Sequence, residues 1–182
     1  WDIRRDGTIQ SLSLTTIVAN AGLFPDRFIR DASGNLVSID TRWINAGETI
    51  TKGIEVGARA SGNLWKGKFT ATIDGTYLIE RKSRVIASAG FGPNEVGAFS
   101  RLGDVPVRWK HAASFNYMQG PWSGTLTQLY TAGYKDAVLP GVANGTVVPA
   151  NWDPNVKAYI TYNLMVTYSG IKNLAITAGV KN

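Results

Sequence analysis

The chain has 182 residues, of which 44% are hydrophobic and 18% are charged, and its formal net charge is +6. This composition supplies enough apolar surface for a core or a lipid-facing surface, and it excludes a disordered chain. The absence of cysteine excludes disulfides and thiolate metal sites, and the absence of a run of about 18 apolar residues excludes a transmembrane helix. The basic residues are scattered without a cluster, so no nucleic-acid partner is expected.

The first thirty residues predict a strand followed by a short helix in a loop. Apolar and polar residues alternate, with interruptions, over residues 1–14, which indicates an incoming strand. From Thr15 to Arg30 the apolar residues have near-helical spacing. We expect Thr15 or Thr16 to cap this helix, and Gly22 and Pro25 to end it.

The most regular stretch runs from Asn45 to Ala60 and alternates strictly from Gly53 onward. A period of two places the two sets of side chains on opposite faces of a β-strand. The apolar set is Ile54, Val56, Ala58 and Ala60, and the polar set includes Glu55 and Arg59. The pattern alone leaves open whether the apolar face meets a protein core or lipid, because a soluble antiparallel sandwich has the same alternation.

Five further strands are predicted downstream by the same alternation. Short polar turns join some of them, whereas two connections are long and rich in Gly and Pro. One irregularity stands out, because Gln128 and Leu129 interrupt the alternation of their strand. The predicted strands cover residues 68–80, 107–117, 122–130, 158–168 and 174–180, and the long connections cover 82–104 and 133–154.

Short turns that alternate with loops of about twenty residues are typical of a barrel in a membrane, where strands have roughly ten residues and the long loops lie outside. Aromatic residues fall near both ends of the predicted strands, as the aromatic girdles of such barrels do. We therefore predict an all-β fold, an antiparallel transmembrane β-barrel segment of about seven strands. Open backbone edges cannot face hydrocarbon, so other strands must complete the barrel. The alternative is a soluble β-sandwich whose core contains these aromatics.

Two motifs resemble those of TonB-dependent outer-membrane receptors. The segment Asn45-x-Gly47-x-x-x-Thr51-Lys52-Gly53-Ile54-Glu55 looks like the descending-strand motif in the C-terminal half of these receptors. The segment 174–182 is similar to the ending of the family's penultimate strand. The resemblance implies a bacterial outer-membrane location and a larger barrel, of about 22 strands, to which all of residues 1–182 belong. It also implies that the plug domain and earlier strands precede Trp1 and that a final strand follows Asn182.

Nothing in the sequence predicts an enzyme, a metal site or a cofactor. His111 is the only histidine, and the alternation places it on the apolar face with Trp109 and Phe115, where it is a poor catalytic base. Asp74 and Glu80 share a strand face but lie about 20 Å apart at the rise of a strand, which is too far for a common metal ion. No Gly-rich loop between a strand and a helix indicates phosphate binding.

Transport and ligand binding are the remaining classes of function, and the sequence is compatible with two hypotheses. The first is a TonB-dependent receptor for active uptake of a scarce nutrient such as a ferric siderophore; the second is a soluble β-sandwich ligand-binding module. For the receptor, the resemblance implies as partners membrane lipid and lipopolysaccharide, the TonB complex through the plug, and a small-molecule ligand such as a metal chelate. The predicted ligand-contact loops are Thr15–Arg30, Arg81–Asp104 and Gly133–Pro154.

The predicted lumen-facing residues carry a basic excess. This excess favours an anionic ligand, or else the charges pair with the plug and with one another. Carboxylates that accompany them are Glu55, Asp74 and Glu80. The candidate ligand-binding residues are Arg59, Lys68, Arg108, Lys110 and Lys157.

Overall fold

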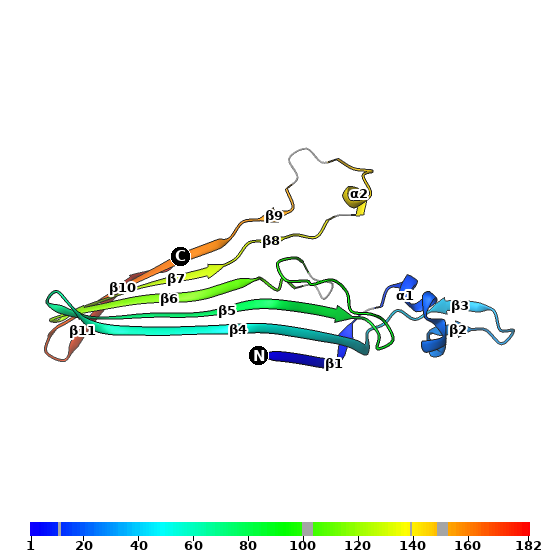
Figure 1. Ribbon diagram of the computed structural model, residues 1–182, viewed down its shortest axis with the longest axis horizontal. Helices are drawn as coiled ribbons and strands as arrows, with labels where there is room; N and C mark the ends of the chain where they lie inside the picture. Colours follow the sequence, from blue (N-terminus) through cyan, green and yellow to red (C-terminus); the bar gives the residue numbers. More distant parts are fainter. Residues whose placement is uncertain (11, 100–103, 139, 149–152) are drawn as a thin grey trace. The chain divides into compact units, whose positions relative to one another are not determined.

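A seven-stranded antiparallel sheet dominates the computed structural model, which describes residues 1–10, 12–99, 104–138, 140–148 and 153–182. The strand order is β1-β4-β5-β6-β7-β10-β11, so each strand pairs with its neighbours in the meander, and β1 and β11 form the edges (Figure 1). The strands are β1 (Asp2–Gln10), β4 (Ile44–Leu64), β5 (Gly67–Arg84), β6 (Trp109–Gln119), β7 (Trp122–Thr131), β10 (Tyr159–Ile171) and β11 (Leu174–Val180). This sheet confirms the predicted fold class and the predicted number of strands.

Three hairpins of the sheet have connections of only two residues. Such turns need backbone with positive φ, because only then does their twist match that of the strands. The turn from β6 to β7 is Gly120-Pro121, with φ of +55° at Gly120. In the other two turns Trp65 (φ +50°) and Asn173 (φ +63°) adopt this conformation. The tight turns therefore fix the register of the strands at one end of the sheet.

The long connections contain more regular structure than the sequence predicts. A short hairpin, β2–β3, lies between β1 and β4, and a pair of two-residue strands, β8 and β9, lies between β7 and β10. Residues 139 and 149–152 of the predicted loop 133–154 lie outside the described residues. The additional elements are α1 (Leu14–Ala19), two 3-10 turns (Ala21–Leu23 and Pro25–Arg27), β2 (Phe28–Arg30), β3 (Leu36–Ile39), β8 (Tyr134–Lys135), α2 (Pro140–Ala143) and β9 (Asn155–Val156).

The predicted boundaries of the first helix are wrong. The N-cap is Ser13, whose hydroxyl accepts a hydrogen bond from the backbone N–H of Thr16 at 3.1 Å, so the helix begins before Thr15. It ends at Ala19, because Asn20 leaves the helical conformation with φ of −124°. The cap and the end are local hydrogen-bonding choices, and several Ser, Thr and Asn residues in this segment could have made them.

The chain divides into two compact units, which we describe separately. The loop unit comprises Asp2–Thr51 and Arg81–Asn94, and the sheet unit comprises Trp1, Lys52–Glu80 and Glu95–Asn182. The loop unit has a small hydrophobic core formed by Leu12, Ile17 and Ile86. Partly buried side chains that pack on this core are Phe24, Phe28, Ile39, Val85 and Ala89.

The sheet unit has its large apolar side chains exposed. Ile54 is 52% exposed, Leu126 is 45% exposed and Leu164 is 48% exposed. In the part of the chain that the structure describes, no second layer covers these residues. A soluble protein rarely leaves such a continuous apolar surface uncovered. The described residues therefore form a sheet whose exposed apolar side chains differ from the covered core of a β-sandwich.

Candidate functional site

The register of the strands sorts the side chains of the sheet unit into two faces. Residues directly opposite in neighbouring strands point to the same side. One row joins Thr72 of β5 to Ser114 of β6 and Thr127 of β7, and the adjacent row joins Ala71 to Phe115 and Leu126. We call the first side the polar face and the second the apolar face. The polar and glycine residues of the polar face are Glu55, Gly57, Arg59, Lys68, Thr70, Thr72, Asp74, Thr76, Lys110, Ser114, Asn116, Thr125, Thr127, Thr161, Asn163, Thr167 and Thr177, and the register places Ala112, Met118, Leu129 and Met165 on the same face.

Hydrogen bonds between neighbouring strands reinforce the polar face. The hydroxyls of Thr72 and Ser114 lie 2.7 Å apart, and those of Thr167 and Thr177 lie 2.9 Å apart. Asn116 donates from Nδ2 to the hydroxyl of Thr125 at 2.8 Å. These side chains form hydrogen bonds with one another within the sheet. The charged side chains of the same face are therefore the groups that can bind a partner.

A hollow of about 710 Å³ lies against β4 to β7 on this face. Glu55, Asp74 and Lys110 contribute to its lining, so the hollow contains two carboxylates and one amine. Gly57 keeps the space beside Asp74 open, since a Cβ at this position would lie 3.2 Å from Asp74 Oδ1. Among the residues that the structure describes, none forms an ion pair with these three side chains.

The structure does not gather the five predicted ligand-binding residues into one cluster. Lys68 and Lys110 lie on the polar face, and only Lys110 lines the hollow. Arg59 falls on the same face by the alternation of β4, because Gly57, two residues earlier, lies beside Asp74. Arg108 precedes β6, and its guanidinium lies over the ring of Tyr77, 5.9 Å from the ring centroid. Lys157 lies between β9 and β10. All five residues are exposed, so each can contact a partner in solution.

Gln128, which interrupts the alternation of its strand, belongs to a hydrogen-bonded polar group that was not predicted from the sequence. Gln128 lies on the apolar face, opposite Ala113 and Tyr162, without a shift in register. Its side chain is held between His111 and Tyr162 by hydrogen bonds of 3.0 Å and 2.7 Å. The interruption of the alternation was the signal, because a polar residue on a lipid-like face requires partners on its own face.

The loop unit contains a cluster of charged residues around Glu48 that was not predicted from the sequence. Glu48 is 4% exposed and forms ion pairs with Arg4 and Arg84, and the Nε of Arg84 lies 2.6 Å from Glu48 Oε2. The guanidinium of Arg84 also lies over the ring of Phe91, 4.9 Å from its centroid. Nothing in the sequence distinguishes Glu48 from other carboxylates, because its two partners come from different strands.

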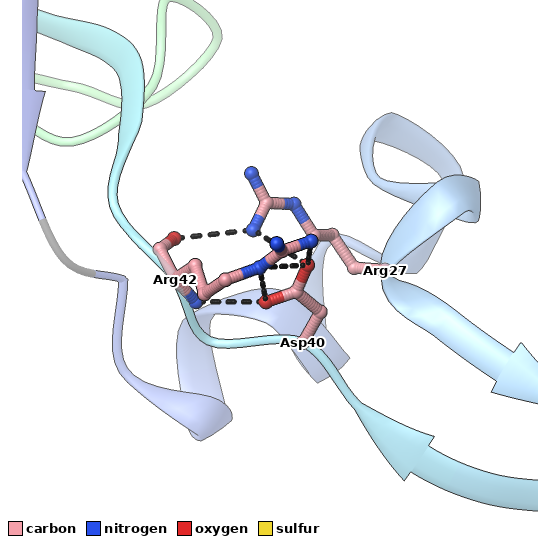
Figure 2. A network of polar contacts seen from close by, with 3 residues as sticks. All are labelled: Arg27, Asp40 and Arg42. Carbon is pink, nitrogen blue, oxygen red and sulfur yellow. Dashed lines mark hydrogen bonds and ion pairs between the residues drawn. The ribbon is translucent and has the colours of Figure 1, made fainter.

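A second cluster joins Arg27, Asp40 and Arg42 beside the β2–β3 hairpin (Figure 2). The guanidinium of Arg42 binds both carboxylate oxygens of Asp40, with Nη2 at 2.7 Å from Oδ2 and Nε at 3.0 Å from Oδ1. Arg27 adds an ion pair at 3.4 Å and donates from Nη1 to the backbone carbonyl of Arg42 at 3.1 Å. The side-chain and backbone hydrogen bonds from Arg42 lower the pKa of Asp40 to about 2.

The described residues contain no group of three or more acidic or histidine side chains that could hold a metal ion. No helix in the described segments is long and apolar enough to cross a bilayer. His111 accepts a hydrogen bond at Nδ1 from the indole N–H of Trp109 at 2.8 Å, so the basic nitrogen of its ring is already occupied. The register also confirms that His111 shares the apolar face with Trp109 and Phe115.

Comparison with protein families gives a match over the entire chain. Residues 1–182 match the model for "TonB dependent receptor-like, beta-barrel". No curated protein and no solved structure matches the chain. The match covers both motifs on which the resemblance was based, and it includes both units of the chain.

Proposed function

The chain belongs to the β-barrel family of TonB-dependent receptors, and we propose that it forms part of the wall of a receptor for active uptake of a scarce nutrient such as a ferric siderophore. The family consists of receptors in the bacterial outer membrane and is not an enzyme family. The observation that carries the proposal is the family match over residues 1–182 together with the exposed apolar face. The same two observations argue against the soluble β-sandwich module.

The dimensions of β5 support a crossing of the membrane. Its apolar face continues from Phe69 to Ile79, which corresponds to about 33 Å along a strand and, at a tilt of about 40°, to about 25 Å of depth. This matches the height of the apolar band in outer-membrane barrels. β4 and β5 have 21 and 18 residues, more than the roughly 9–11 that a crossing needs. Part of each strand therefore lies in water on the side of the long connections.

The polar face is the surface that the proposal assigns to the lumen. Arg59 and Lys68 are exposed and form no ion pair with another residue in the described ranges, which leaves both charges available to an anionic ligand or to the plug. Glu55 and Asp74 in the hollow would bind cationic groups of the same partners. We place the TonB complex among the partners, through a plug domain outside the chain, and we place ligand recognition in the long connections.

An uptake assay tests this function. The receptor that contains this chain is expressed in cells starved of iron, and uptake of a panel of ⁵⁵Fe-loaded anionic siderophores is measured with and without an active TonB. The proposal expects at least one ferric siderophore whose uptake requires both the receptor and TonB. If no chelate on the panel needs the receptor, the nutrient is not a ferric siderophore.

Charge-reversed variants test the role of the polar face. Arg59→Glu and Lys68→Glu reverse charges on that face, whereas Lys172→Glu makes the same change in the short turn before β11. Because like charges repel an anion, we expect uptake to fall in the first two variants and to remain unchanged in the third. Equal uptake in all three would remove the polar face from the ligand path.

A further inference from the structure

The three short turns of the sheet fill one backbone position with different residues. Each turn has a residue with positive φ, which is Trp65 at +50°, Gly120 at +55° or Asn173 at +63°. Glycine and asparagine adopt this conformation readily, whereas a bulky aromatic residue is an outlier there. Residues held in such strained conformations cluster at functional sites. Trp65 is therefore the residue of the short turns whose presence calls for an explanation beyond the fold.

The indole of Trp65 gains almost nothing from burial, because the residue is 91% exposed. The turn that carries it is nevertheless well fixed. The hydroxyl of Tyr117 lies 3.1 Å from the backbone carbonyl oxygen of Leu64, and a Cβ at Gly67 would clash with the carbonyl oxygen of Met118. A fixed turn thus presents an exposed indole, with a cost in backbone strain that packing does not offset.

Trp65 lies too far from the apolar band of the sheet to be explained as a lipid-facing residue. The apolar face of β5 begins at Phe69, four residues after Trp65, which corresponds to about 13 Å along the strand and about 10 Å in depth at a tilt of about 40°. The headgroup region on each side of the hydrocarbon core is only about 5–7 Å thick. The turn therefore reaches the water on the side of the short turns, which is the periplasmic side in outer-membrane barrels.

The charges at this end of the sheet are basic. In the three two-residue turns, which the structure describes in full, only Lys66 and Lys172 are charged, and both are exposed. Lys68 follows in β5, and the first carboxylate of that strand, Asp74, lies six residues further on, about 20 Å away. With no carboxylate close by in the hairpin, the amines of this end attract an anionic partner.

The three turns form a narrow strip that suits a linear polymer. They follow one another at one end of the sheet (Figure 1), and successive turns are two strand spacings apart, about 10 Å. Lys66 and Lys172 are therefore separated by about 20 Å, which a small anion cannot span. A typical protein partner contacts about 20–30 residues on each side, far more than this strip offers. An extended anionic chain that also presents rings to the indole meets both conditions.

We propose that the short-turn end of the sheet binds the glycan strands of peptidoglycan, a polymer of N-acetylated sugars that carries peptide carboxylates. The apolar face of a sugar ring stacks on the indole of Trp65, and carboxylates of the same polymer pair with Lys66 and Lys172. The polymer lies on the periplasmic side, where the short turns end. The inference uses the outer-membrane location of the family and does not depend on which nutrient is taken up.

Sedimentation with purified, insoluble peptidoglycan measures the interaction. The receptor that contains this chain is purified in a mild detergent and mixed with peptidoglycan, and the fraction that pellets is measured over a range of peptidoglycan concentrations. Trp65→Gly removes the indole and supplies the residue that the positive φ favours, so the turn keeps its conformation. Lys66→Gln removes one charge. Trp43→Gly is the matched control, because Trp43 is 69% exposed but belongs to the loop unit and to none of the short turns.

The proposal expects the receptor and Trp43→Gly to bind peptidoglycan equally well. Trp65→Gly should bind about two- to tenfold more weakly, which corresponds to the loss of one aromatic contact. Its stability to denaturant in lipid vesicles should be equal or higher, because the strain at this position is relieved. Lys66→Gln should also bind more weakly, by a factor that shrinks at high salt.

Three results would overturn the proposal. The first is equal binding of peptidoglycan by the receptor and Trp65→Gly. The second is a loss of stability in Trp65→Gly, which would make the indole a packing residue of the turn. The third is a receptor that binds anionic phospholipid vesicles but no peptidoglycan, which would assign the basic strip to the membrane surface.

Discussion

The loop unit and the sheet unit differ in where they place apolar and charged side chains. In the loop unit, Ile17 is 1% exposed in a small core and Glu48 is enclosed by two arginines. In the sheet unit, large apolar side chains such as Leu164 are exposed, and Arg59 and Lys68 lie on the surface without an ion-pair partner in the described ranges. The loop unit therefore encloses a small core, although Ile9, Val37 and Trp43 stay exposed, whereas in the sheet unit Leu126 and Leu164 are exposed along one face of the sheet.

The largest expected effect tests the core of the loop unit. Ile17→Ala deletes a buried side chain and should cost about 2–5 kcal/mol of local stability, through lost burial and the cavity left behind. Leu126→Ala, on the exposed apolar face, should cost less, because lipid can fill the space. Hydrogen exchange of the loop-unit amides in the intact receptor, followed by mass spectrometry, measures the first effect. Equal costs at both positions would mean that the two units do not differ in the way described.

A charge on each face of the sheet is the next test. Ala58→Arg places a guanidinium on the apolar face and should destabilise the folded barrel by about 2–4 kcal/mol if it lies near the middle of the bilayer. Thr72→Arg places the same group on the polar face, where the main loss is the hydrogen bond with Ser114, about 0.5–1.5 kcal/mol. Unfolding in lipid vesicles distinguishes the two variants. Similar costs would show that the assignment of the faces is wrong.

Two glycines of the apolar face allow a test of how Trp109 packs on β5, with a smaller expected loss of stability. A Cβ at Gly75 would lie 2.3 Å from the indole of Trp109, so Gly75→Ala must displace that ring and should cost about 1–3 kcal/mol. Gly124 on the same face has no atom within 4 Å of the equivalent position, so Gly124→Ala is the control and should be nearly neutral. Tryptophan fluorescence and unfolding in vesicles report both. If Gly75→Ala is neutral as well, the indole does not pack on β5 as described.

The strands and their faces could be predicted from the sequence because a period of two is a local pattern. The register confirms that Ala71 and Ala113 share one face and that Asp74 and Lys110 share the other, and Ala58 lines the same groove as Ala71 and Ala113. The interruption at Gln128 was visible but could not be interpreted, because its partners lie on the two neighbouring strands.

The ends of the first helix and the charge clusters of the loop unit could not be predicted from the sequence. Ser13 was one of several residues able to cap the helix, and Glu48 pairs with Arg4 and Arg84, which are far from it in sequence. Only the folded chain brings these charges together. The charge clusters are therefore a property of tertiary structure, whereas the alternation is a property of each strand.

The smallest expected effect concerns pH and the hairpin β2–β3 in the loop unit. The pKa of Asp40 is lowered from 3.8 to about 2, chiefly by the hydrogen bonds from Arg42, so the folded hairpin favours the carboxylate more than the unfolded chain does. This contribution is fully present above pH 4 or so and is lost as the pH falls from about 4 through 2. Asp31 in the same hairpin also has a lowered pKa, through hydrogen bonds from Asn35, and titrates in the same direction.

Hydrogen-exchange protection of the hairpin amides, corrected for the intrinsic exchange rate at each pH, should therefore fall as the pH is lowered from about 5 to 2. Asp40→Asn removes the titrating group, so its protection should be lower at pH 5 and change less with pH. Asp31→Asn is the matched control, because it leaves the cluster of Arg27, Asp40 and Arg42 intact and should retain the Asp40 part of the pH dependence. An unchanged pH profile in Asp40→Asn would assign the loss of protection at low pH to Asp31. The cluster would then stabilise the hairpin equally well with Asp40 neutral.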